Sequence, residues 1–205
     1  MIRYKCLRGL GGMLAAHPEL RLHPARLDAV VDRTLRASFR ALHARVVLER
    51  GGREREERRT SSHKLLVELL RDKERFAIER LFRTLGLRYP AENFRRIYVG
   101  LTAGTADERS SARELLESLL PKQLGGAVLG LTDDVDAEQR LRGGAAIGPL
   151  GPDSYAALLL ELTREPSATL RSLAVSHARE IGLDLAESVE ASVPQTQAGG
   201  GTHAT

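Results

Sequence analysis

Apolar residues recur at steps of three and four positions along most of this 205-residue chain. This spacing matches the 3.6-residue turn of an α-helix, whereas a half-buried strand alternates with a period of two. The clearest stripe starts soon after Pro24, a residue that suits the first turn of a helix. It comprises Leu27, Val31, Leu35, Phe39, Leu42 and Val46. Since no segment shows a strand pattern, we predict an all-α fold.

Glycines, prolines and polar turns indicate where the helices begin and end. Gly51-Gly52 should end the second helix, and Gly86 should cap the third. Thr105 and Glu108 have the spacing of a capping box, which should begin the helix that carries Leu115 and its neighbours. The expected helices span residues 1–16, 24–50, 53–85, 91–104, 105–120, 122–131, 133–143, 155–162 and 167–181, with a glycine-proline loop over 143–152.

Short connections between successive helices favour antiparallel neighbours. Helical pairs of roughly 40 residues are typical of α-solenoids, although no clear internal repeat is visible. We therefore predict a HEAT-like stack of antiparallel helices that forms one helical-repeat domain over residues 1–191. The last residues, 192–205, are rich in glycine and polar residues and are expected to be a disordered tail. Aromatic residues make up 4% of the chain and Trp is absent, so Leu, Ala and Val must fill the core.

The net charge of +4 comes from arginine, since lysine occurs at only a few positions. On the helix that begins at Pro24, a set of arginines lies opposite the apolar stripe at 100° per residue. Its members, the candidate interaction face, are Arg26, Arg33, Arg36 and Arg40. One interpretation is a solvated outer face, and the other is a face that binds nucleic acid through phosphate contacts.

The chemistry-bearing residues do not form a recognisable catalytic, cofactor or metal motif. His43, His63 and His177 stand apart in the sequence, without metal-ligand spacing, and are expected to be solvated or capping residues. Ser176 and His177 are adjacent on a helix and cannot face each other as a catalytic dyad. We therefore predict no catalytic, cofactor-binding or metal-binding residues, no cofactor and no enzymatic activity. The single cysteine, Cys6, is expected to be a buried packing residue.

One stretch, ERLFRTLGLRYPAENFRRIYVGLTAGTADERSSARELLESLLP, resembles a segment of a bacterial helical family. The family comprises the cytosolic HEAT-like domains that follow membrane domains similar to the ATP/ADP translocases. The matching positions are Phe82, Arg83, Leu85, Gly86, Leu87, Tyr89 and Pro90, followed by Ala112, Glu114, Leu115, Leu116, Leu119, Leu120 and Pro121. The chain departs from the family pattern at Asn93, where an acid is expected, and over residues 125–151, which are rich in glycine.

The resemblance implies a non-catalytic scaffold that binds a protein, as an accessory to a membrane transporter of the nucleotide-transporter type. Transport itself is not implied, because the chain contains no membrane domain. No signal peptide is visible, and no apolar run approaches the roughly 20 residues that a membrane span needs. We therefore expect a cytoplasmic protein that reaches the inner membrane through a protein partner, without direct membrane insertion. The alternative is a helical repeat that binds nucleic acid through the arginine face.

Overall fold

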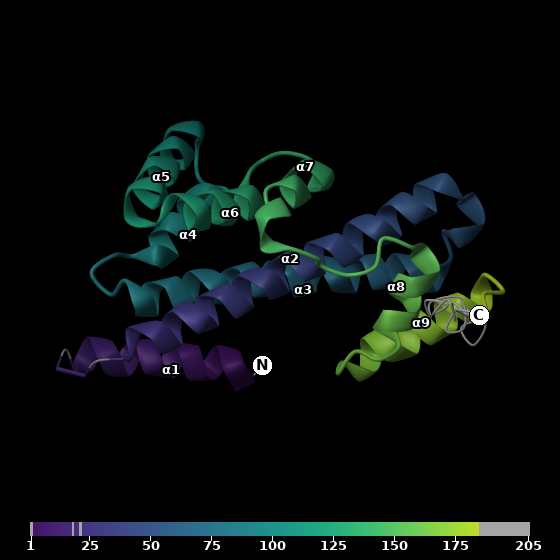
Figure 1. Cartoon of the computed structure of the whole chain (residues 1–205), viewed down its shortest axis with the longest axis horizontal. Coiled ribbons are helices and arrows are strands. Elements are labelled where there is room, and N and C mark those ends of the chain that lie inside the picture. Colours follow the sequence, from purple (N-terminus) through teal and green to yellow (C-terminus); the bar gives the residue numbers. More distant parts are fainter. Residues whose placement is uncertain (1, 18, 21, 185–205) are drawn as a thin grey trace, which may run out of the picture. The chain divides into compact units, whose positions relative to one another are not determined.

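The computed structural model describes residues 2–17, 19–20 and 22–184. Within these ranges the chain forms nine α-helices and two short 3-10 helices, and no strand (Figure 1). The prediction of an all-α fold is therefore confirmed. Within the described ranges the chain divides into two compact units: the first comprises the residues up to 50 together with 67–151, and the second comprises residues 51–66 and 152–184. The single domain expected over 1–191 stays a prediction, and the tail expected over 192–205 lies outside the described residues.

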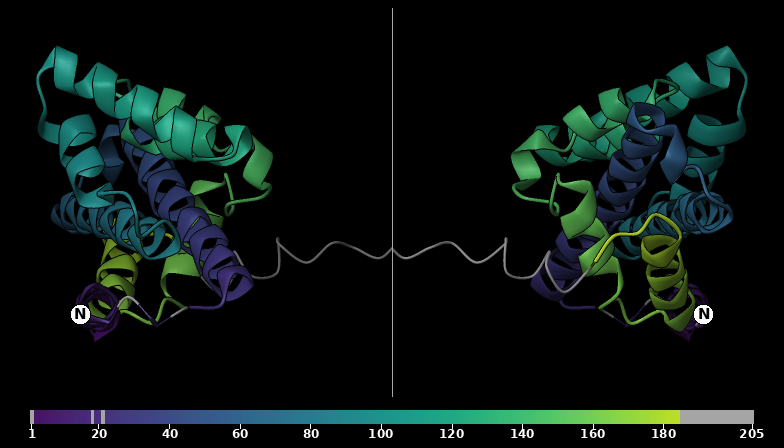
Figure 2. Two further views of the ribbon diagram at one scale, coloured as in Figure 1. Left: turned by 90° about the vertical axis from the view of Figure 1, so that its left-hand side faces the viewer. Right: turned by 90° about the vertical axis from the view of Figure 1, so that its right-hand side faces the viewer.

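The first unit is built on two long helices, each of which also contributes its other end to the second unit. Asp28 near the start of α2 pairs with Arg88 at the end of α3, and Arg45 pairs with Glu74. These pairs show that α2 and α3 run antiparallel. The helices α4 to α7 lie together on one side of the α2–α3 pair, and α1 lies on the other side (Figures 1 and 2). The helices of this unit are α1 (Ile2–Ala16), α2 (Pro24–Glu54), α3 (Ser61–Arg88), α4 (Phe94–Ala103), α5 (Ala106–Leu119), α6 (Lys122–Thr132) and α7 (Ala137–Arg142).

The apolar stripe predicted on α2 is buried in the core of this unit, except for its first member. Leu27 is half-buried, whereas the side chains of Phe39 and Leu42 are completely inaccessible to solvent. Residues from α3 to α6 complete the same cluster, so the shorter helices are held by apolar packing against the long pair. Gly144, in the turn before the 3-10 helix η2 (Ala145–Ile147), contributes by its small size. A Cβ atom there would lie 2.4 Å from Cδ1 of Phe39, so only glycine lets this backbone pass over the ring.

The capping box predicted at the start of α5 is present. The Thr105 side chain accepts a hydrogen bond from the Glu108 backbone, and the Glu108 carboxylate accepts one from the Thr105 backbone. Of the leucines on this helix, Leu116 is fully buried, but Leu115 is 41% exposed. Adjacent helical residues point 100° apart, so Leu116 takes the inward position and Leu115 faces outward. Cys6 on α1 is also exposed and not buried as expected.

The second unit contains the end of α2, the start of α3, the 3-10 helix η1 (Glu56–Arg58), α8 (Tyr155–Leu162) and α9 (Ala168–Glu180). The sequence predicted α8 and α9 correctly to within a residue. It was wrong about Gly51-Gly52, because α2 continues through both glycines to Glu54. Both glycines are buried at close approaches: a Cβ on Gly51 would lie 2.2 Å from Cδ2 of Tyr155. They are needed for packing, and they do not break the helix.

Two further boundaries differ from the prediction. The third helix begins at Ser61, after η1, and not within the charged run at 53–59. It also continues past Gly86 to Arg88, so Gly86 is not its cap. In the second unit, the arginines of the charged run fold back onto the end of α2 instead. Arg59 Nε donates to the Gly52 carbonyl oxygen at 2.7 Å, which satisfies an acceptor that a helix end leaves open.

Candidate functional site

A cleft with a volume of about 430 Å³ opens in the first unit between residues of α2, α3, α4, α5, α6 and α7. Its walls carry five arginines against three carboxylates, together with Tyr98, two threonines and three aliphatic side chains. We call it the arginine cleft. Its charged residues are Arg45, Arg71, Arg75, Arg109, Arg140, Glu74, Asp133 and Asp134.

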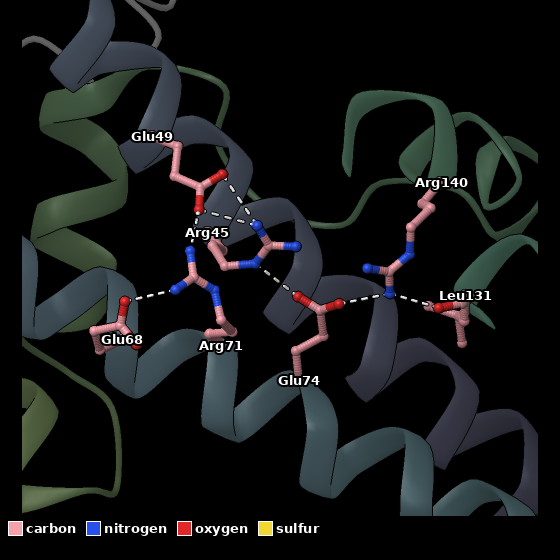
Figure 3. A network of polar contacts seen from close by, with 7 residues as sticks. All are labelled: Arg45, Glu49, Glu68, Arg71, Glu74, Leu131 and Arg140. Atoms are coloured by element: carbon pink, nitrogen blue, oxygen red, sulfur yellow. Dashed lines mark hydrogen bonds and ion pairs between the residues drawn. The ribbon is translucent and has the colours of Figure 1, made fainter. Parts of the chain in front are cut away.

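Glu74 of α3 is the centre of a chain of ion pairs along one wall of the cleft (Figure 3). One carboxylate oxygen accepts from Arg45 Nε at 2.8 Å, and the other accepts from Arg140 Nη2 at 2.6 Å. Arg45 also donates to both oxygens of Glu49, at 3.0 Å each. Arg71 joins Glu49 to Glu68, and Arg140 also donates to the Leu131 carbonyl oxygen. We call this set of seven residues the Glu74 network.

The innermost part of the network is buried. The side chains of Arg45 and Glu74 are 8% and 5% exposed. Burial opposes the charge on Arg45, but the hydrogen bond and the charge of Glu74, followed by those of Glu49, raise its pKa above the usual value. A buried ion pair costs desolvation energy and needs good geometry to offset that cost. The matched hydrogen bonds of Glu74 to two guanidinium groups meet this requirement.

Two guanidinium nitrogens of this network remain available to a ligand. Arg45 Nη2 and Arg140 Nη1 donate to no group among residues that the structure describes. Figure 3 shows both nitrogens pointing into the space between the two arginines, beside Glu74. Neither is sealed from solvent, unlike Arg140 Nε, which is buried without a partner. The cleft therefore presents two fixed hydrogen-bond donors, each carrying part of a positive charge.

The other acidic residues of the cleft are engaged with arginines. Arg109 donates to Asp134 at 2.7 Å, and Arg113 pairs with Asp133. Asp136, which follows them, caps α7 by accepting from the Gln139 backbone, as expected for an acidic turn at a helix start. Asp133 and Asp134 are thus paired with other arginines, and neither accepts a hydrogen bond from Arg45 Nη2 or Arg140 Nη1.

The arginine face predicted on α2 lies apart from the cleft lining. All four of its arginines are exposed. Arg36 is engaged twice, since its Nε lies 3.0 Å from Asp32 and its Nη1 donates to the Ile147 carbonyl oxygen at 2.7 Å. Within the described ranges, no ion pair involves the others, Arg26, Arg33 and Arg40. Sequence spacing found this face because its members share one helix. The residues of the cleft come from six helices, and no local pattern links them.

The second unit holds a different polar group, the His177 cluster, which comprises Thr60, His63, Tyr155 and His177. His177 is fully buried, with Nε2 2.6 Å from the Tyr155 hydroxyl and Nδ1 2.9 Å from the Thr60 hydroxyl. The ring of His63 is also buried, with its centre 5.4 Å from that of His177. The expectation that His63 and His177 are solvated or capping residues is wrong, and so it is for His43, which is buried in the first unit.

The protonation states of the His177 cluster indicate a neutral, structural role. Burial, followed by the charge of His63, lowers the pKa of His177 to about 4. Burial also raises the pKa of Tyr155 to about 12. A neutral imidazole between two hydroxyls is satisfied in either tautomer, because each hydroxyl can donate or accept. Ser176 does not touch the imidazole; its hydroxyl lies 3.0 Å from that of Ser62, which also donates to Glu180.

Among residues placed by the structure, no group of three or more His, Cys, Asp or Glu side chains is arranged to hold a metal ion. None of the helices in the described ranges has the length and apolar character required to cross a membrane.

Comparison with known proteins gives no relative. No family model matches the chain, and neither a curated protein nor a solved structure resembles it significantly.

Proposed function

We propose that this protein is a non-catalytic helical scaffold that binds a protein partner through the arginine cleft. The observation that carries the proposal is the composition of the cleft lining, which has five arginines and a tyrosine. Arginine and tyrosine are enriched at protein interfaces and dominate binding hot spots, whereas lysine is depleted there. None of the fourteen lining residues is a lysine.

The chemistry of the cleft favours binding over catalysis. Burial raises the pKa of Tyr98, so its phenol stays protonated at neutral pH. The hydroxyls of Thr102 and Thr132 are used within their own helices, where they donate to backbone carbonyl oxygens one turn earlier. A nucleophile needs an adjacent base to become reactive, and these hydroxyls have carbonyl partners instead. The cleft therefore offers recognition groups.

We further propose that the helices form a HEAT-like stack and that the protein is an accessory to a membrane transporter of the nucleotide-transporter type. Two observations support this. The long helices α2 and α3 are antiparallel, as in a helical-repeat pair. The segment that resembles the bacterial family, from the end of α3 to the start of α6, contains two well-formed short helices, α4 and α5.

The protein partner can be tested by capture from membranes of the native host, with variants on the rim of the cleft. The Arg75 side chain is 63% exposed, so Arg75→Glu reverses a rim charge without disturbing the core. The matched control is Arg95→Glu, an exposed arginine of α4 that does not line the cleft. We expect a membrane protein that is recovered with the wild type and the control, but at least several-fold less with Arg75→Glu. Equal recovery with all three would contradict a partner in the cleft.

A direct attachment to lipid can be distinguished in the same preparation. We expect the purified protein not to sediment with anionic liposomes, because acidic residues offset the roughly 1 kcal/mol that each basic residue gains near such a surface. Strong sedimentation with protein-free liposomes would show that the protein binds lipid directly and would contradict attachment through a protein partner.

A second candidate function, nucleic-acid binding, is favoured by a single observation. Arg26, Arg33 and Arg40 are exposed and form no ion pair within the described ranges. Such side chains are free to contact phosphates, and a helix face of this kind binds without sequence preference. The salt dependence of binding separates this function from the scaffold and is described below.

A further inference from the structure

One carboxylate in the arginine cleft holds two arginines in a position that a ligand can use. Glu74 accepts from Arg45 on one oxygen and from Arg140 on the other, so the two guanidinium groups lie on either side of it. Glu74 is the carboxylate that the two groups share, and Arg45 also pairs with Glu49. Each group still has an unpartnered nitrogen, Arg45 Nη2 or Arg140 Nη1, directed at the space between them (Figure 3). We infer that Arg45 and Arg140 bind the phosphate group of a ligand at this point.

The geometry favours a phosphate over a carboxylate. A planar carboxylate pairs best with one arginine that presents two parallel N–H groups. Here each arginine has already used one edge on Glu74, and each offers one free nitrogen from a different side. A tetrahedral phosphate has oxygens that point in several directions and accepts from both sides at once.

The burial of Arg45 indicates that the site is rigid. Its side chain is only 8% exposed, and it donates hydrogen bonds to both Glu49 and Glu74. A donor that is already fixed loses little conformational entropy when a ligand binds. The site is therefore unlike a surface arginine, which must be ordered by the ligand itself.

The remaining charges of the cleft are paired with one another, so they do not supply the attraction for an anion. Arg45 and Arg71 also pair with Glu49, and Arg75 pairs with Asp72. Asp133 and Asp134, the acids on the far wall, are paired with Arg113 and Arg109. The attraction for a phosphate therefore depends on the two unpartnered nitrogens of Arg45 and Arg140.

The inference goes beyond the proposed scaffold function, because a phosphate site requires no protein partner. The same group has two sources, a small phosphate or phosphate ester and a phosphorylated side chain of a protein. Both present the same oxygens to Arg45 and Arg140, and they differ in what is attached to the phosphorus.

Isothermal titration calorimetry of the full chain tests the site, with inorganic phosphate as the probe and acetate at equal ionic strength as the planar comparison. We expect one phosphate per chain and acetate binding at least about tenfold weaker. Arg140→Gln should weaken phosphate binding by roughly ten- to a hundredfold, the range for a lost charged hydrogen bond. Arg142→Gln, on the same helix but outside the lining, is the control and should bind like the wild type.

Equal affinity of the wild type and Arg140→Gln, or equal loss in both variants, would overturn the inference. If circular dichroism shows that Arg140→Gln does not fold, Arg75→Gln at the rim replaces it. The inference would then be overturned if Arg75→Gln bound phosphate as tightly as the wild type and the wild type bound acetate as tightly as phosphate. A phosphoserine peptide in the same cell distinguishes the sources. Binding at least as tight as inorganic phosphate supports a phosphorylated side chain, and binding of inorganic phosphate alone supports a small anion.

Discussion

The two units of the protein contain polar groups of opposite character. The Glu74 network of the first unit is fully charged, and it lines a cleft with two unused donors. The His177 cluster of the second unit is neutral, and its central imidazole has both nitrogens satisfied by hydroxyl groups. Polar residues that are buried and fully satisfied specify packing, whereas a charged residue with an unused donor can still bind a ligand. The first is therefore the candidate for binding and the second for structure.

Breaking the charged network should have the largest effect. Glu74→Gln removes the carboxylate that Arg45 and Arg140 share, which leaves Arg140 without an acidic partner and Arg45 with Glu49 alone. We expect the free energy of unfolding to fall by about 3–5 kcal/mol, measured by urea denaturation. The control is Glu117→Gln, which removes an exposed carboxylate 3.8 Å from Arg113 and should cost less than about 1 kcal/mol. A similar small loss in both variants would show that the network is not buried in solution.

The His177 cluster should make the free energy of unfolding depend on pH. The folded pKa of His177, about 4, lies below the unfolded value of 6.5, so the unfolded chain binds a proton that the folded chain does not. Stability is therefore lost as the pH falls from 6.5 towards 4, by about 2 kcal/mol at pH 5. Urea denaturation between pH 5 and 7 measures this slope. The slope should vanish in His177→Phe and persist in His17→Gln, since His17 is an exposed residue that follows α1. An unchanged slope in His177→Phe would show that another group binds the proton.

The close packing around the neutral cluster can be tested with a matched pair of glycines, both within α-helices. Gly51→Ala would place a Cβ 2.2 Å from the Tyr155 ring, and overpacking of this kind costs about 1–3 kcal/mol. Gly126→Ala on α6 meets no heavy atom within 4 Å and should stabilise the protein by about 0.5–1 kcal/mol, because alanine favours the helix. Melting temperatures that move in opposite directions confirm the packing role. Two stabilising substitutions would mean that Gly51 is only a weak point of the helix.

The smallest effect is expected at the arginine face of α2. If Arg33 and Arg36 contacted DNA phosphates, each contact would add about 0.9 to the slope of log affinity against log salt. We expect little binding to mixed-sequence duplex DNA at physiological salt, measured by fluorescence anisotropy, and no further change in Arg33→Glu/Arg36→Glu. Tight DNA binding by the wild type that is lost in this double variant would show that the binding surface is the arginine face of α2 and not the cleft.

Features that depend on neighbouring residues could be predicted from the sequence, and those that depend on distant ones could not. The capping box of Thr105 and Glu108 was found because both residues lie within one turn. Gly51-Gly52 was misread as a break because the Tyr155 and His63 rings that require it arrive from elsewhere in the chain.

The same limit applies to the candidate sites. The arginine face was predicted because its residues share a helix, but nothing local distinguishes Arg45 or Arg140 from other arginines. Their partner Glu74 lies 29 positions from Arg45 and 66 from Arg140, so only the packing of the helices brings them together. Arg45 lies within positions 41–48, all of which are buried in the folded chain, and this burial could not be read from the sequence.

The contrast between the two polar groups is tested most directly by nuclear magnetic resonance of the ¹⁵N-labelled protein titrated with phosphate. We expect chemical-shift changes centred on the backbone amides of Glu74, Leu131 and Arg140, with those of Tyr155 and His177 unchanged. If the largest changes occurred at the His177 cluster, or if no shifts changed at saturating phosphate, the assignment of binding to the Glu74 network would be wrong.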